Sequence, residues 1–260
     1  MTDDQIETKH KLDQIPHLEI TRYLPEIPLD KFLTELKQFN DEDFIPYQSG
    51  APSEQFRQFI ATAWQGISII DALKDGKNFI DYYTTDRNSD DHDFSISSDG
   101  ELIFRPTDIY HRVRSMLRYI YSISRYPNRT RLSRMMPHGG NATWHNHAEL
   151  VKGSSRFTNS KYLEIIVVHI PLVTNEESTM IVANHDPRIL DLSDDLRFYS
   201  QHYAAGTAWI FNSNNYHNAY NIGKTPRDHI LMYVSFKDPI LYPYIKKAVD
   251  DYDGIMISSE

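Results

Sequence analysis

The sequence predicts a mainly β protein with flanking helices, arranged as a sandwich or jelly roll. Three observations support this fold class. Beyond residue 126, short runs with strand character alternate with turn residues, which is the pattern of antiparallel all-β domains. Among them, LEIIVVHIPLV at 163–173 is apolar enough for a strand buried on both faces. The 17 tyrosines and 12 phenylalanines also favour strands.

The chain divides into three parts. Residues 1–125 are expected to form a mixed α/β segment that packs on the core, residues 126–238 the β core itself, and residues 239–260 a C-terminal helix with an acidic tail. The strands of the core are expected at 130–136, 142–147, 162–173, 178–184, 207–212 and 229–236.

The first part of the chain contains several different patterns. Residues 1–15 look like a polar lead without regular structure. Apolar residues recur at helical spacing in 30–39 and in 107–124, so we expect two helices there. A short strand is expected at 44–47, whereas 60–73 combines strand and helix character and favours neither.

The composition bounds the classes of function. The net charge of −9 is spread along the chain, which argues against nucleic acid as a partner because phosphate binding needs a basic face. The lack of cysteine excludes disulfides, thiolate nucleophiles and cysteine-ligated zinc. No apolar run is long enough to cross a membrane, and the polar N-terminus has no signal-peptide core. We therefore expect a soluble, cytoplasmic protein without a membrane or nucleic-acid partner.

Two histidine-containing motifs indicate a metal site. WHNHAEL places His145, His147 and Glu149 on one side of the chain if the segment is extended. GTAWIFNSNNYHNAYNIGKTPRDHILMYV carries His217 between two strand-like runs, and Arg227 follows ten positions later. Two or three protein ligands on one face of a metal ion leave positions open for other molecules. An arginine fork can bind a carboxylate through two hydrogen bonds, so the pattern fits a mononuclear iron site that uses a keto acid.

Four segments, in the same order, resemble the aspartyl/asparaginyl β-hydroxylase family of Fe(II)/2-oxoglutarate-dependent dioxygenases. RLSRMMPHGG is similar to that family's arginine-containing strand and Pro/Gly turn, and WHNH to the end of its His-x-Asp strand. VHIPLVTN is similar to its histidine–proline strand. GTAWIFNSNNYHNAYNIGKTPRDHILMYV is similar to the strands that carry its second metal histidine and its keto-acid arginine. The resemblance covers residues 131–236 and does not extend to the first half of the chain.

This resemblance implies a double-stranded β-helix, the cupin-like jelly roll, as the catalytic core. It implies Fe(II) and 2-oxoglutarate as cofactor and co-substrate, with O2 as the oxidant. The reaction implied is hydroxylation of an amino acid, a peptide side chain or a related small metabolite.

The resemblance also assigns roles to individual residues. His145 and His217 match metal ligands, and His147 stands where the family has an aspartate. Shifting the register by two residues makes His147 and Glu149 the pair instead, so Glu149 is the alternative to His147. Arg227 is expected to form a salt bridge with the distal carboxylate of 2-oxoglutarate.

Two further residues are candidates for binding the co-substrate. His169, in an otherwise apolar run, matches a histidine that helps to hold the keto acid, although Val167 replaces an arginine that the family often has. Arg134 would face the barrel interior if Ser133 and Met135 face outward, and could there contact the co-substrate or a substrate carboxylate. Three other histidines lack a partner pattern and are interpreted as ordinary surface or packing residues: His185, His202 and His229.

Two other functions are open at this point. One is a dioxygenase that needs no keto acid and binds its metal through His145, His147 and His217. The other is a non-catalytic jelly-roll binding module, which the missing aspartate and Val167 favour.

Overall fold

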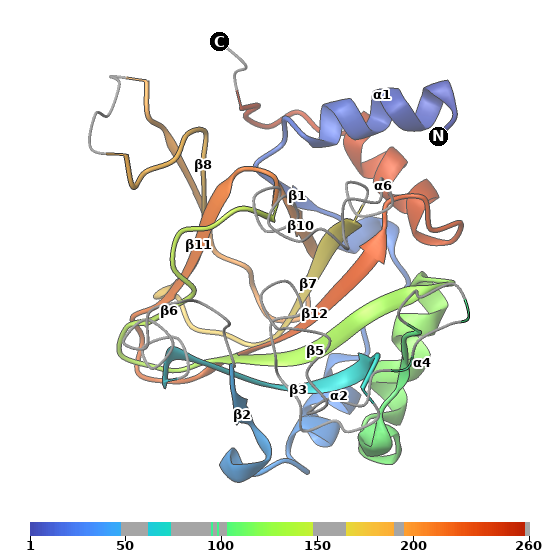
Figure 1. Ribbon diagram of the computed structural model, residues 1–260, viewed down its shortest axis with the longest axis vertical. Helices are drawn as coiled ribbons and strands as arrows, with labels where there is room; N and C mark the ends of the chain where they lie inside the picture. Colours follow the sequence, from blue (N-terminus) through green and yellow to red (C-terminus); the bar gives the residue numbers. More distant parts are fainter. Residues whose placement is uncertain are drawn as a thin grey trace.

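The computed structural model shows a protein built mainly from antiparallel strands (Figure 1). It describes residues 1–47, 62–73, 95, 98, 103–147, 165–189 and 195–257. The strands form two sheets, and the longer helices gather on the side of the larger sheet that is away from the smaller one.

The larger sheet has eight strands. Across the sheet they follow the order β1 (His17–Glu19), β10 (Trp209–Phe211), β7 (Ile165–Val173), β12 (Arg227–Ser235), β5 (Pro127–Met135), β3 (Trp64–Asp71) and β2 (Ile45–Pro46), with β4 (Arg105–Pro106) paired to β3. Strands β1 to β4 come from the first 125 residues, so this part of the chain supplies both flanks of the sheet. The segment that combined strand and helix character, 60–73, contains strand β3.

The smaller sheet has four strands. In order they are β6 (Gly140–Asn141), β11 (Tyr216–Asn221), β8 (Ser178–Ala183) and β9 (Phe198–Gln201). From β5 onward, β5, β7, β10 and β12 belong to the larger sheet and β6, β8, β9 and β11 to the smaller. The chain therefore crosses repeatedly between two facing sheets, which is the jelly-roll arrangement. The predicted fold class is confirmed.

Helices pack against the outer face of the larger sheet. In the described part of the chain the α-helices are α1 (Asp3–Leu12), α2 (Leu29–Leu36), α4 (Arg114–Ile123) and α6 (Leu241–Asp250), and the 3₁₀ helices are η1 (Thr21–Tyr23), η2 (Asp41–Asp43) and η3 (Asp108–Arg112). Phe32, Met116 and Ile245 from three of the helices share one buried cluster with Val168 of β7 and Met232 of β12. Since each strand alternates its side chains, the opposite face of the same strands is left for a pocket.

The N-terminus is more ordered than its polar sequence suggests. Residues 3–12 form helix α1, so the prediction of a lead without regular structure is wrong. Thr2 and Gln5 make a capping box, in which each side chain bonds to the other residue's backbone N–H. The helix is also tied to α6, because the hydroxyl of Tyr242 donates to Asp4 at 2.5 Å.

Two other predicted elements differ from the structure. The helix expected at 107–124 is divided at Val113, whose φ of −127° separates η3 from α4. The strand expected at 142–147 is not continuous: β6 ends at Asn141, and Thr143 adopts a φ of +61°. A left-handed residue cannot continue an extended strand, so only His145 re-forms a bridge.

Asp238 joins the end of α4 to the start of α6. Its carboxylate accepts hydrogen bonds from the Ser124 hydroxyl at 2.8 Å and from the backbone N–H groups of Tyr126 at 2.9 Å and Leu241 at 3.1 Å. Burial alone would raise the pKa of Asp238, but these hydrogen bonds outweigh it and hold the pKa below its ordinary value of 3.8.

We expect Asp238→Asn to lower the free energy of unfolding by about 2–3 kcal/mol at neutral pH. Both carboxylate oxygens of Asp238 accept hydrogen bonds, whereas an amide has only one oxygen that can accept them. The depressed pKa means that the carboxylate stabilises the fold above its unfolded pKa of 3.8, and that this contribution is lost as the pH falls through the folded pKa. Urea unfolding of both proteins at neutral and acidic pH measures the difference. A gap that stayed constant with pH would contradict this account.

Candidate functional site

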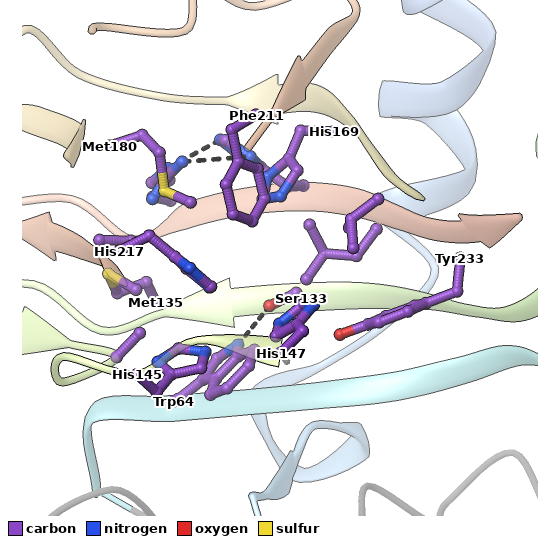
Figure 2. Close-up of a pocket in the computed structure, with 16 residues that line it drawn as sticks. Trp64, Ser133, Met135, His145, His147, His169, Met180, Phe211, His217 and Tyr233 are labelled. Carbon is purple, nitrogen blue, oxygen red and sulfur yellow. Dashed lines mark hydrogen bonds between the residues drawn. The ribbon is translucent and has the colours of Figure 1, made fainter. Parts of the chain in front are cut away.

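A pocket lies between the two sheets (Figure 2). It encloses about 560 Å³ of space outside the protein atoms, part of it open to solvent. The larger sheet lines it with Trp64, Ser133, Met135, Val167, His169, Phe211, Arg227, His229, Leu231 and Tyr233; the smaller sheet with Met180, His217 and Ala219; and the segment after β6 with Ala142, His145 and His147.

Three histidines converge in this pocket. His145, His147 and His217 each offer one ring nitrogen, and the three nitrogens lie within 4.8 Å of one another. Figure 2 shows the three rings around a common space, and the ring centroid of His217 lies 4.2 Å from that of His145 and 4.9 Å from that of His147. This spacing is suited to a single metal ion held on one face.

The backbone brings these histidines together. His145 and His217 form an isolated antiparallel bridge, with the His217 N–H donating to the His145 carbonyl at 2.9 Å and the reverse bond at 3.2 Å. The His147 N–H donates to the carbonyl of Ser213, just before β11, at 2.9 Å. The segment after β6 is thus fastened to the edge of the smaller sheet, and all three rings project into the pocket.

Hydrogen bonds fix which ring nitrogen faces the common space. The Nδ1 of His145 lies 2.9 Å from the carbonyl oxygen of Thr143, and the Nδ1 of His217 lies 2.9 Å from that of Asn215. A carbonyl can only accept, so both Nδ1 atoms carry the proton. Each Nε2 therefore keeps its lone pair, which is how ligating histidines are commonly oriented.

Burial keeps two of the ligand candidates, His147 and His217, neutral. It lowers the pKa of His147 to about 3, with smaller effects from His145 and Arg129. Burial and the neighbouring His145 likewise hold the pKa of His217 well below its ordinary value. Neutral imidazoles can bind a metal ion without first losing a proton. Glu149, the alternative to His147, lies outside the described residues.

Arg227 is a buried cation in the same pocket. It is the first residue of β12, is only 5% exposed, and pairs with Met135 of β5. Burial lowers the pKa of Arg227 to about 10, which still leaves the guanidinium charged at neutral pH. Among the described residues, no carboxylate forms an ion pair with it; its Nε instead donates to Nε2 of His229 at 2.8 Å. A buried positive charge in this state favours an anionic ligand.

His169 lies on β7 beside this arginine. Its ring centroid is 5.0 Å from that of Phe211 and 5.9 Å from that of His229. Burial and then the charge of Arg227 hold the pKa of His169 well below its ordinary value. Its buried Nδ1 has no hydrogen-bond partner among the described residues. An unsatisfied polar atom of this kind costs about 1–3 kcal/mol, so a ligand that bonds to it would be stabilised.

The orientation predicted for Arg134 is wrong. Ser133 and Met135 line the pocket, so Arg134 between them lies on the other face of β5. There its Nε donates to Asp228 at 2.8 Å and its Nη1 to Asp41 at 2.7 Å. With two acidic partners outside the pocket, Arg134 is not placed to contact a co-substrate in it.

Sequence reasoning missed several residues that line the pocket, and three of them contact or extend the predicted site. His229, interpreted as a packing residue, holds Arg227, and Tyr233 stacks on His147 with ring centroids 6.2 Å apart. Trp64 comes from β3, in a segment whose pattern favoured neither strand nor helix. A usable signal existed for the first two, because residues 229, 231 and 233 alternate with Arg227 along one strand.

Comparison with known proteins places the fold. No family model matches the sequence, and no curated protein matches it. The fold is similar to that of the non-heme alpha ketoglutarate dependent epimerase SnoN from nogalamycin biosynthesis, with a TM-score of 0.50, 11% identity, and coverage of 89% of this chain and 83% of that chain. This likeness concerns the fold and agrees with the jelly-roll strand order.

Two further solved structures have lower TM-scores. One is an oxidoreductase of the 2OG-Fe(II) oxygenase family from Burkholderia pseudomallei, with a TM-score of 0.46, 10% identity and 89% coverage of both chains. The other is a Pseudomonas putida prolyl-4-hydroxylase, with a TM-score of 0.41, 9% identity, and coverage of 89% of this chain and 98% of that chain.

No helix in the described part of the chain is both long and apolar enough to cross a bilayer.

We expect His145→Ala and His217→Ala each to weaken Co(II) binding by on the order of 100-fold, because each removes one nitrogen of the cluster. Calorimetric titration with Co(II) measures the affinity, and His111→Ala, a change at an exposed histidine, is the matched control. His147→Ala should behave like the other two. If it binds Co(II) as tightly as the wild type, the third ligand lies elsewhere and Glu149 becomes the candidate.

Proposed function

We propose that the protein is an Fe(II)/2-oxoglutarate-dependent dioxygenase that hydroxylates an amino acid, a peptide side chain or a related small metabolite. One observation carries the proposal: buried Arg227, without an acidic partner among the described residues, shares a pocket with three convergent imidazoles. A metal ion alone would need only the imidazoles. A ligand that uses both features is a carboxylic acid that also chelates the metal.

The donor set fits iron. His145, His147 and His217 supply nitrogen ligands, and imidazole is suited to Fe(II). These three residues would hold the ion and leave room for a chelating keto acid and for O2. When bound together, these groups supply the oxidation: 2-oxoglutarate becomes succinate and CO2, one atom of O2 enters succinate, and the other enters the substrate C–H bond as a hydroxyl group.

The other end of the pocket fits the distal carboxylate of the keto acid. Arg227 uses Nε for His229 and has further N–H donors on its two Nη atoms. His169 adds a buried Nδ1 that has no hydrogen-bond partner in the part of the chain that the structure describes. Val167, where an arginine was expected by resemblance, lines the same pocket with an apolar side chain. The charge that binds the carboxylate is therefore assigned to Arg227.

The remaining pocket residues control the environment of the reaction. Trp64, Met135, Met180, Phe211 and Leu231 surround the polar groups with apolar surface. Such a lining excludes water, which strengthens the attraction between a guanidinium and a carboxylate. It also shelters a reactive oxidant from side reactions.

We also infer a relation to the aspartyl/asparaginyl β-hydroxylases. The order of motifs between residues 131 and 236 supports this relation. So does the position of His217 at the start of β11 and of Arg227 at the start of β12.

A second function is favoured by a different observation. The third nitrogen of the cluster belongs to a histidine, His147, and not to a carboxylate. An all-histidine site is also what a dioxygenase without a keto acid would use. O2 consumption with Fe(II) alone, and no effect of added 2-oxoglutarate, would identify that reaction.

We expect anaerobic titration of the Fe(II)-loaded protein with 2-oxoglutarate to produce the weak visible charge-transfer band of a chelated keto acid. Arg227→Ala should weaken this binding by on the order of 100-fold, because it removes a charged, two-point contact to the carboxylate. Arg227→Lys should recover little of the loss, since an ammonium group lacks the fork.

Arg22→Ala serves as the matched control, because that arginine is exposed on the surface. An unchanged titration in Arg227→Ala would contradict the proposed pocket. Iron binding without any band would support the dioxygenase that needs no keto acid, and no iron binding at all would support a non-catalytic module.

A further inference from the structure

Within the described residues, Arg227 is held by a histidine and not by an acid. Its Nε donates to Nε2 of His229 at 2.8 Å, and its Nη2 lies 3.4 Å from Nδ1 of the same ring. One edge of the guanidinium therefore faces one edge of the imidazole. Both side chains are buried, at 5% and 3% exposure, and both line the pocket.

The protonation state of His229 follows from this contact. A guanidinium has only donors, so Nε2 of His229 must be an unprotonated acceptor. Burial, followed by the charge of Arg227, holds the pKa of His229 well below its ordinary value. The imidazole is therefore neutral, and it satisfies one N–H of Arg227 without cancelling the positive charge.

An acid in the same place would act differently. Buried arginines are usually paired with carboxylates, and such a pair is close to neutral overall. A ligand carboxylate would then have to compete with the internal one. On the larger sheet's other face, Arg134 is held in that manner by Asp228 and Asp41. The two arginines thus show two kinds of support, one that neutralises the cation and one that leaves its charge available.

We propose that His229 is a positioning residue for Arg227: it accepts the Nε–H, fixes the plane of the guanidinium and leaves both the charge and the Nη donors for the distal carboxylate of 2-oxoglutarate. The inference depends on the proposed function, and it assigns a role that the sequence pattern did not reveal. His229 acts through Arg227 and does not need to touch the co-substrate.

His229 is itself well placed to be rigid. Its backbone lies in β12 between two neighbouring strands, opposite Ser133 of β5 and Pro171 of β7. Its ring meets that of His169 edge-on, at 5.9 Å and 89°. A strand residue paired on both sides has little conformational freedom. His229 can therefore hold the guanidinium in one orientation with little further loss of side-chain entropy.

Three substitutions separate positioning from simple packing. His229→Leu fills similar space but accepts no hydrogen bond. His229→Gln offers a neutral carbonyl oxygen near the position of Nε2. His229→Glu offers an acceptor there with a negative charge. The quantity measured is the dissociation constant of 2-oxoglutarate for the Co(II)-loaded protein, together with the affinity for Co(II) itself.

We expect His229→Leu to weaken 2-oxoglutarate binding by about 10- to 100-fold, as removal of a supporting hydrogen bond does at other sites. His229→Gln should stay within a few-fold of the wild type, whereas His229→Glu should lose as much as His229→Leu because the internal carboxylate competes with the ligand. Co(II) affinity should change little in all three. In turnover, KM for 2-oxoglutarate should rise more than kcat falls.

His111→Leu is the matched control, since it makes the same chemical change at an exposed histidine. Wild-type binding in His229→Leu, or in His229→Glu, would overturn the inference. If His229→Leu does not fold, the comparison of the Gln and Glu variants still decides it. Failure of the proposed function is recognised separately, because Arg227→Ala would then bind 2-oxoglutarate as well as the wild type.

Discussion

The two-residue alternation of strand β12 is the constraint on which the rest of the molecule depends. Ile230, Met232 and Val234 are fully buried on the face that meets the helices. Arg227 and His229 lie on the face that meets the pocket. Because the strand is paired on both sides, a slip of one residue would move charged side chains into the hydrophobic core and apolar ones into the pocket. The packing of the core thereby sets the geometry of the site.

Charge is distributed unevenly inside the barrel. His147, His169, His217 and His229 are all kept neutral, first of all by burial, while Arg227 remains charged. The neutral rings provide lone pairs for a cation at one place and acceptors for a guanidinium at another. A pocket with a buried cation at Arg227 and a cluster of nitrogens that could hold a metal ion is complementary to a molecule with a carboxylate at one end and a chelating group at the other.

Much of the fold could be predicted from the sequence, since period-two patterns and turn residues mark strands such as β7 and β8 directly. The convergence of His145, His147 and His217 was also accessible, from spacing and resemblance. The orientation of Arg134 was predicted wrongly because the register of a strand with its neighbours decides which of its faces meets the pocket. Ser133, the residue before Arg134, faces the pocket and bonds there to Trp64 of β3, a strand far away in the sequence.

Other features depended on burial or on long-range contacts, which the sequence alone does not provide. The role of His229 depends on its contact with Arg227, two residues before it on the strand. That contact matters because both side chains are buried, and the sequence does not show their burial. Tyr203 is similar: its hydroxyl bonds to Nδ1 of His17 at 2.8 Å, and its ring stacks on Trp209. His17 belongs to β1, so the first strand of the chain supports residues next to the pocket. No local pattern in the first 125 residues predicts this contact.

The bridge between His145 and His217 has a consequence for how a metal ion would be acquired. The two residues lie 72 positions apart in the chain (217 − 145 = 72), yet reciprocal backbone hydrogen bonds already hold them opposite each other. Folding of the sheets, and not binding of the metal, therefore offsets the entropic cost of closing that loop. Loading and exchange of an ion would then be matters of ligand substitution at a finished site, with rates set by access to the pocket and by the ion's own lability.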